Sequence, residues 1–297
     1  MNYADRLEAA VQRTGNACVI GLDPHPALMP EEFAVCRDAS APRAKRAQAT
    51  ERFLVEVIGR IAGRVPAVKP QSAFFELLGA DGVAAWERVV AAARAAKLLV
   101  IGDVKRGDIA STARAYADAF LACEEDFRCD AVTINPYLGA DSVEPFLEVC
   151  AEQGAGVYVL VRTSNPGSGL FQEHGEPRLV DRVATEVARW GEGLLGACGL
   201  SSVGAVVGAT HTAELAQLRE RMPHTPFLIP GYGAQGAGVD EIKPGFLAGG
   251  RGALVNSSRG ILYAHKNPAH ADKSWQDATT AALDAMIAEL RAAAEGC

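Results

Sequence analysis

Residues 98–109 read LLVIGDVKRGDI, an apolar run that ends in a cluster of charged side chains. The Leu, Val and Ile residues are continuous rather than alternating, which is typical of a parallel strand buried on both faces. In a regular strand Asp103 and Lys105 lie two positions apart, so their side chains leave on the same face. The stretch therefore predicts a buried parallel strand that carries a carboxylate, Asp103, and an ammonium group, Lys105, at its carboxyl end.

Apolar runs of the same kind recur along the whole chain, at 17–23, 65–70, 130–136, 156–164, 203–210, 226–231 and 252–258. Stretches with helical periodicity separate them, at 44–63, 81–97, 109–122, 141–153, 178–198, 212–221 and 270–295, and a further helix around 3–13 precedes the first run. Alternating strands and helices favour βαβ units with right-handed crossovers, and eight such units close into a barrel. We therefore predict an α/β fold, a single (β/α)8 TIM barrel over residues 1–297 with an extra N-terminal helix. A doubly wound open sheet is the alternative, but GLDPHP at 21–26 is not the Gly-rich turn that usually follows its first strand.

The composition excludes several classes of function. The chain has 297 residues, 49% hydrophobic residues and a net charge of −7, without a basic run, so binding to nucleic acid or to a membrane surface is not expected. Neither the seven cysteines nor the six histidines show metal-ligand spacing, and no apolar stretch is long enough to cross a membrane. These features indicate a soluble cytoplasmic protein with reduced thiols and no metal.

Charged residues end several of the predicted strands, where a barrel fold places the active site. Asp23 and Lys69 end the first two, so the barrel should bring Asp23, Lys69, Asp103 and Lys105 together with alternating sign. Any one of them could belong to an ordinary surface ion network, but four together indicate a compensating functional cluster. In that cluster Lys105 stays protonated beside the ionised Asp103, which suits general acid catalysis.

The last two strands end in glycine-rich segments, PGYGAQGAG at 230–238 and NSSRGI at 256–261. Loops at these positions of a barrel commonly bind phosphate through backbone N–H groups, and Arg259 adds a guanidinium suited to phosphate oxygens. Turn geometry alone is the alternative explanation for such glycines.

The segment DVKRGDI at 103–109 resembles the DxKxxDI signature of the orotidine 5′-phosphate decarboxylase family. Further segments are similar to that family in the same order, namely GLDP, AVKPQ, NPYLGADSVEPF, RTSNPGS, PGYGAQG and VNSSRGI. The resemblance runs from about residue 15 to residue 264 and is strongest to the larger bacterial enzymes.

The resemblance implies decarboxylation of orotidine 5′-phosphate to uridine 5′-phosphate in pyrimidine biosynthesis, without metal or organic cofactor. Lys105 would protonate the ring carbon and Asp103 would face the departing carboxylate. Lys69 would bridge the charge network and, with Asp23, contact the ribose hydroxyls. Family membership also implies a homodimer with shared active sites, in which Asp108 and Thr112 reach the neighbouring subunit's site.

The remaining implied contacts are with the base and the phosphate. Ser164 resembles the residue that contacts the pyrimidine edge, and Gln235 resembles the side chain that spans base and phosphate. Arg259, together with backbone amides near Gly233 and Ser258, resembles the groups that bind the phosphate in this family.

The sequence departs from the family pattern at two places. Tyr232 stands where a small aliphatic residue is expected, and residues 28–45 contain no motif. The glycines of residues 165–177 suggest that this segment forms a lid over the site. Two alternative functions stay open. One is a sugar-phosphate enzyme of the same barrel that uses Mg²⁺, and the other is a nucleotide-binding barrel without catalysis.

Overall fold

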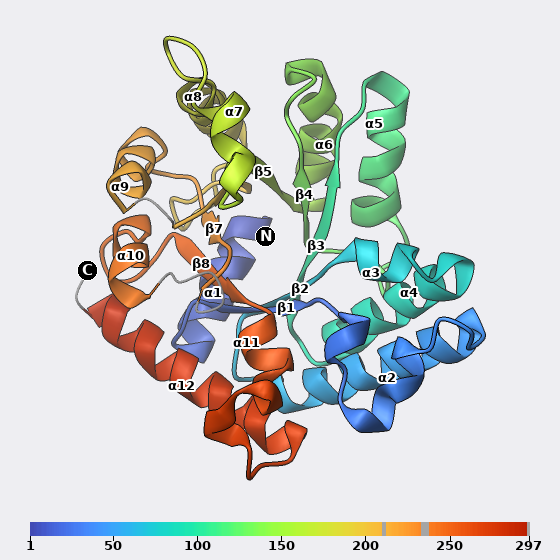
Figure 1. The fold of residues 1–297 in the computed structure, drawn as a ribbon. Helices are drawn as coiled ribbons and strands as arrows, with labels where there is room; N and C mark the ends of the chain where they lie inside the picture. Colours follow the sequence, from blue (N-terminus) through green and yellow to red (C-terminus); the bar gives the residue numbers. More distant parts are fainter. Residues whose placement is uncertain (210–211, 233–237, 296–297) are drawn as a thin grey trace.

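The computed structural model describes residues 1–209, 212–232 and 238–295. Its eight strands are β1 Cys18–Leu22, β2 Ala67–Pro70, β3 Leu99–Arg106, β4 Ala131–Ile134, β5 Gly156–Arg162, β6 Val203–Val207, β7 Phe227–Ile229 and β8 Ala253–Ser257. Each strand pairs in parallel with the next, and β8 pairs with β1, so the sheet closes into a barrel (Figure 1). The predicted (β/α)8 barrel is confirmed, and the open sheet is wrong.

A ring of helices surrounds the barrel (Figure 1). The longer ones are α2 Arg43–Ile61, α4 Gly79–Ala95, α5 Ala110–Ala117, α6 Ala140–Gln153, α8 Leu179–Gly191, α9 Thr212–Arg221 and α12 Trp275–Glu295, and the short ones are α3 Ser72–Glu76, α7 Gly169–Gln172, α10 Val239–Ile242 and α11 Arg259–Leu262. The helix expected over 178–198 ends early, at Gly191, and continues only as a 3-10 turn over Glu192–Leu194.

The extra N-terminal helix, α1 Tyr3–Thr14, is also confirmed. Its Tyr3 and Leu7 pack against residues that point into the barrel from the strands, and the Tyr3 hydroxyl lies 3.0 Å from that of Tyr158. An ion pair between Arg6 and the buried Asp130 holds the helix in place. Because α1 closes the amino-terminal end of the barrel, ligands have access at the carboxyl ends of the strands.

The motif-free segment 28–45 has a structural role. It contains a 3-10 helix over Glu31–Arg37, whose Phe33 ring packs 5.3 Å from that of Phe53 on α2 and 5.9 Å from that of Trp275 on α12. The segment therefore joins two outer helices. No helix within the described residues is both long and apolar enough to cross a membrane.

Candidate active site

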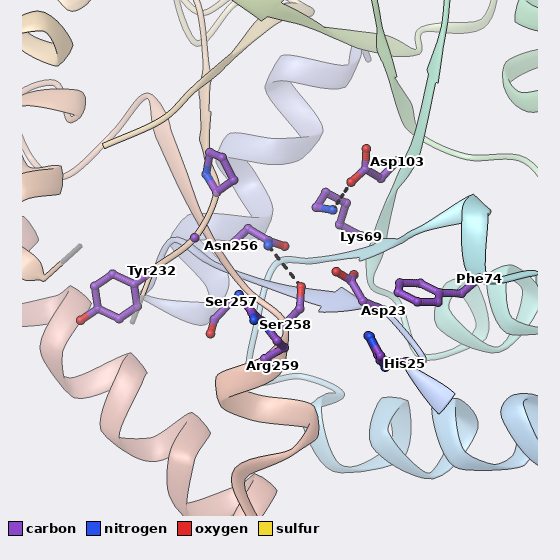
Figure 2. Close-up of a pocket in the computed structure, with 12 residues that line it drawn as sticks. Asp23, His25, Lys69, Phe74, Asp103, Tyr232, Asn256, Ser257, Ser258 and Arg259 are labelled. Carbon is purple, nitrogen blue, oxygen red and sulfur yellow. Dashed lines mark hydrogen bonds and ion pairs between the residues drawn. The ribbon is translucent and has the colours of Figure 1, made fainter. Parts of the chain in front are cut away.

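Asp103 forms the centre of the site, because four side chains from three neighbouring strand ends bond its carboxylate. Lys69 of β2 donates to Oδ2, and Gln71, just after β2, donates to the same oxygen at 2.9 Å. Lys105 Nζ lies 2.5 Å from Oδ1, and the Thr133 hydroxyl of β4 donates to Oδ1 at 3.0 Å. Lys69 and Asp103 are both buried (Figure 2), whereas the side chain of Lys105 is 47% exposed, so the network is open to solvent on the Lys105 side.

Lys105 reaches Asp103 through an irregular backbone and not through a regular pleat. The pairing of β3 with β4 shifts register between Gly102 and Arg106, and Lys105 has a φ of 44°, in the left-handed region. The N–H groups of Val104 and Lys105 leave the ladder and donate to the Thr133 hydroxyl at 3.1 and 3.0 Å. The predicted contact of Lys105 with Asp103 is therefore present, but a β-bulge supported by Thr133 creates it.

The charges of the network stabilise one another. Burial would raise the pKa of Asp103, but the ammonium groups of Lys69 and Lys105 lower that pKa far below its usual range. Burial would lower the pKa of Lys69, but the carboxylates of Asp103 and Asp23 raise it. At neutral pH Asp103 is thus an anion and Lys69 a cation.

A cavity of about 300 Å³ opens on one side of the network (Figure 2). It is lined by Asp23, His25, Lys69, Phe74, Asp103, Pro230, Gly231, Tyr232, Asn256, Ser257, Ser258 and Arg259. Two buried oxygens in it, Asp23 Oδ1 and Asn256 Oδ1, form no hydrogen bond with any described residue. Buried acceptors require donors, so these oxygens are suited to the hydroxyl groups of a ligand.

The cationic end of this cavity lies after β8. Arg259 is exposed there and forms no ion pair with any carboxylate in the described part of the chain. Gly21 of β1 lets the loop approach, because a Cβ at Gly21 would lie 1.8 Å from the Ser258 hydroxyl oxygen. Arg259 and Ser258 are therefore placed to bind an anionic group.

A second cavity of about 280 Å³ lies on the other side and shares Lys69, Asp103 and Pro230 with the first. Leu160, Val206 and Leu228 give it an apolar wall from β5, β6 and β7, and its polar lining consists of Lys105, Thr133, Thr163, Ser164 and Asn165. An apolar wall with a few polar groups suits a flat ring. The charged Asp103 thus stands between a polar cavity and a partly apolar one.

Comparison with known proteins places this geometry in a family. Residues 18–274 match the model of the orotidine 5′-phosphate decarboxylase / HUMPS family. The chain belongs to this family. It is 45% identical to the orotidine 5′-phosphate decarboxylase of Rhodopirellula baltica, over 98% of this chain and 99% of that protein. The enzyme of the same name from Clostridium novyi is 37% identical, over 96% of this chain and 97% of that one.

Solved structures of the family agree with the fold. The structure of Leishmania donovani OMP decarboxylase superposes with a TM-score of 0.77 at 30% identity and covers 100% of both chains. The resemblance in the sequence motifs is therefore confirmed at the level of the family.

The structure brings together most of the residues expected from the family motifs. Ser258 and Arg259 line the first cavity, and Ser164 lines the second. Asp108 is half-buried and Thr112 is exposed, and neither lines either of these two cavities. Gly233 and Gln235 lie outside the described residues, so their phosphate and base contacts stay predictions.

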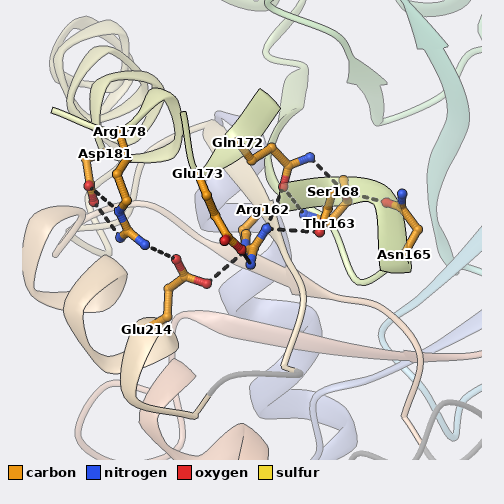
Figure 3. Close-up of polar contacts among 9 residues, drawn as sticks. All are labelled: Arg162, Thr163, Asn165, Ser168, Gln172, Glu173, Arg178, Asp181 and Glu214. Atoms are coloured by element: carbon orange, nitrogen blue, oxygen red, sulfur yellow. Dashed lines mark hydrogen bonds and ion pairs between the residues drawn. The ribbon is translucent and has the colours of Figure 1, made fainter. Parts of the chain in front are cut away.

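Arg162 also ends a strand, but it lines neither of the two cavities. It bonds Glu173 and Glu214 (Figure 3). Sequence reasoning placed Asn256 at a strand end but gave it no role, and it missed Gln71 and Thr133 as parts of the site. Gln71 and Asn256 stand within the motifs AVKPQ and VNSSRGI. Thr133 carries a hydroxyl group within an otherwise apolar run, and this exception to the pattern is the signal that could have identified it.

Proposed function

We propose that this protein decarboxylates orotidine 5′-phosphate to uridine 5′-phosphate in pyrimidine biosynthesis, in the cytoplasm and without metal or organic cofactor. The observation that carries the proposal is the ion network Lys69–Asp103–Lys105, which stands between a polar cavity and a partly apolar one. The names of the Rhodopirellula and Clostridium relatives support this substrate.

The first cavity matches the ribose 5′-phosphate part of the substrate. The orphan oxygens of Asp23 and Asn256 accept hydrogen bonds from ribose hydroxyls, and Lys69 lies beside them. Arg259 and Ser258 bind the phosphate, with Gly233 and Gln235 completing the grip. Binding energy from this remote phosphate then becomes available to orient the ring at the reacting centre.

The second cavity takes the pyrimidine, with Ser164 at its edge and the carboxylate of the substrate directed at Asp103. The carbon–carboxylate bond breaks, carbon dioxide leaves, and the electron pair stays on the ring carbon. The ammonium of Lys105 stabilises this negative charge and donates a proton to the carbon, and solvent reprotonates the lysine. Lys69 keeps Asp103 ionised throughout.

The ammonium groups of Lys69 and Lys105 supply the positive charge that stabilises the carbanion, so a metal ion is not needed for this purpose. Both oxygens of Asp103 are engaged by Lys69, Lys105, Gln71 and Thr133. This saturation supports a metal-free reaction, because Asp103 keeps no free lone pair directed to a cation without breaking one of these bonds.

We propose further that the enzyme is a homodimer with shared active sites. Asp108 and Thr112 lie on the loop and first turn after β3, and the loops after β3 and β4 also carry the exposed apolar side chains of Ile109, Tyr137 and Leu138. An exposed apolar group of this kind favours a protein interface, from which Asp108 and Thr112 extend into the partner's site.

The deciding experiment incubates the purified protein with orotidine 5′-phosphate in excess chelator and follows the loss of ultraviolet absorbance, with carbon dioxide release as a check. Rapid turnover is expected. If turnover is absent and a sugar-phosphate reaction appears only with Mg²⁺, the metal-dependent alternative replaces the proposal. Tight nucleotide binding without turnover in either condition identifies the non-catalytic alternative.

A further inference from the structure

Arg162 is a buried arginine at the end of β5 that takes no part in the charge network of Asp103. Its side chain is 4% exposed. The guanidinium donates to Glu214 at 2.7 Å, to Glu173 at 2.5 Å, to the Ser168 hydroxyl at 3.0 Å and to Gln172 at 3.3 Å (Figure 3). Three of these partners lie on one segment, residues 163–173, which contains the short helix α7.

The same segment carries the polar lining of the second cavity. Thr163, Ser164 and Asn165 line that cavity, and Ser164 packs on the end of β6, where a Cβ at Gly208 would lie 3.1 Å from its own Cβ. Gln172 closes the segment into a loop, because its amide oxygen accepts from the N–H of Thr163 at 3.0 Å and its amide nitrogen donates to the Thr163 hydroxyl at 2.8 Å.

Glu214 ties this loop to a second element beside the site. It lies in the first turn of α9, its side chain is 12% exposed, and it also accepts from Arg178 at 2.9 Å. Arg162 therefore fastens the loop after β5 to the start of the helix after β6. A planar guanidinium is suited to this task, since its fixed donors engage several acceptors in one plane.

We propose that Arg162 is a positioning residue that holds segment 163–173 against the second cavity and so determines how tightly the site binds a pyrimidine ring. The proposal rests on the proposed function for the identity of the ring. Removal of the guanidinium takes the shared donor from Glu173, Ser168 and Gln172 and leaves Glu214 paired with Arg178 alone, so the segment is no longer fastened to α9. Ser164 and Asn165 then lose their places, while Asp23, Ser258 and Arg259 keep theirs.

The test compares Arg162→Met with Arg189→Met, the same change in a surface pair of α8 whose arginine is 61% exposed. Binding of uridine 5′-phosphate and of ribose 5-phosphate, which lacks the ring, is measured by calorimetry. Arg162→Met should weaken the binding of uridine 5′-phosphate roughly 10- to 100-fold, because groups that contact the ring are then misplaced. The same variant should bind ribose 5-phosphate as the wild type does, and Arg189→Met should bind both ligands as the wild type does. Arg162→Lys should recover part of the lost affinity, since lysine restores the positive charge but not the planar set of donors.

A second readout needs no substrate. Leu170 and Phe171 on α7 are 74% and 62% exposed, so chymotrypsin should cut there faster in Arg162→Met than in the wild type. Unchanged cleavage and unchanged uridine 5′-phosphate binding would overturn the proposal, and so would an equal loss for both ligands, which indicates general damage.

Two outcomes need separate treatment. If Arg162→Met does not fold, Glu173→Gln decides, because this half-exposed partner keeps an acceptor and should show a smaller loss of the same kind. If the wild type neither turns over orotidine 5′-phosphate nor binds uridine 5′-phosphate, the proposed function and the pyrimidine role both fail. Faster cleavage then still identifies Arg162 as the residue that holds the segment.

Discussion

The ammonium nitrogen of Lys105 lies 2.5 Å from Oδ1 of Asp103, although the backbone of Lys105 is left-handed, with a φ of 44°. A residue other than glycine in this region costs about 1–3 kcal/mol, and such strain persists where surrounding contacts maintain it. Here Thr133 does so, because its hydroxyl bonds both the bulged backbone and Asp103. The strain thus places a proton donor beside a fixed anion.

Lys105→Ala should abolish nearly all turnover while the protein stays folded. A positioned general acid contributes about 100- to 10,000-fold to a rate, and Lys105 is also the cation nearest to the developing charge, so we expect a loss of at least the lower figure. Decarboxylation is followed by absorbance and folding by circular dichroism. Lys45→Ala, at an exposed position of α2, is the control. Retention of most of the rate would contradict the proton-donor role.

Asp108→Ala should be inactive alone but active when mixed with Lys105→Ala. In a shared-site dimer each hybrid has one intact site, so a random equal mixture should recover about a quarter of wild-type activity. Subunit exchange is checked with differently tagged chains. If exchange is complete and the mixture remains inactive, the two residues do not serve one site from different subunits.

Gly21→Ala should raise KM for orotidine 5′-phosphate about tenfold, equivalent to 1.4 kcal/mol of binding. The added methyl would lie 1.8 Å from the Ser258 hydroxyl oxygen and 2.9 Å from its Cβ, so Ser258 must turn or shift beside Arg259. Gly59→Ala on α2 is the matched control, since no atom lies within 4 Å of its added carbon. Steady-state kinetics of both variants checks this, and equal KM values would show that the close approach is unimportant.

The stabilising effect of Asp103 should disappear in acid. The folded-state pKa of Asp103 is lowered, so its contribution is fully present above the unfolded-state value of about 3.9 and is lost as pH falls towards the folded pKa. The free energy of unfolding of the wild type, minus that of Asp103→Asn, should stay constant from pH 8 to 5.

Below the unfolded-state pKa that difference should fall by about 1.4 kcal/mol for each pH unit. Denaturant titrations of both proteins at several pH values measure it. A difference that grew towards low pH would mean that Asp103 is not held as an anion in the folded protein.

Much of the fold followed from local pattern. Continuous apolar runs alternate with amphipathic stretches, and this periodicity is a property of short windows of sequence, so the eight strands and the barrel were predictable. The same pattern located the strand ends, and with them Asp23, Lys69, Asp103 and Lys105, because parallel strands present their carboxyl ends at one face.

Other features depend on contacts between segments that are distant in sequence. The bulge at Lys105 requires the hydroxyl of Thr133 on another strand, and the orphan oxygens of Asp23 and Asn256 are recognised only by the absence of a bonding partner among the described residues. Arg162 ends a strand as Lys69 does, but its guanidinium bonds Glu214 and Glu173 and it lines neither of the two cavities. The sequence by itself determined which charges arrive at the mouth of the barrel. The tertiary structure decided which of them face the cavities, since that depends on which acceptors the packed loops bring within bonding distance.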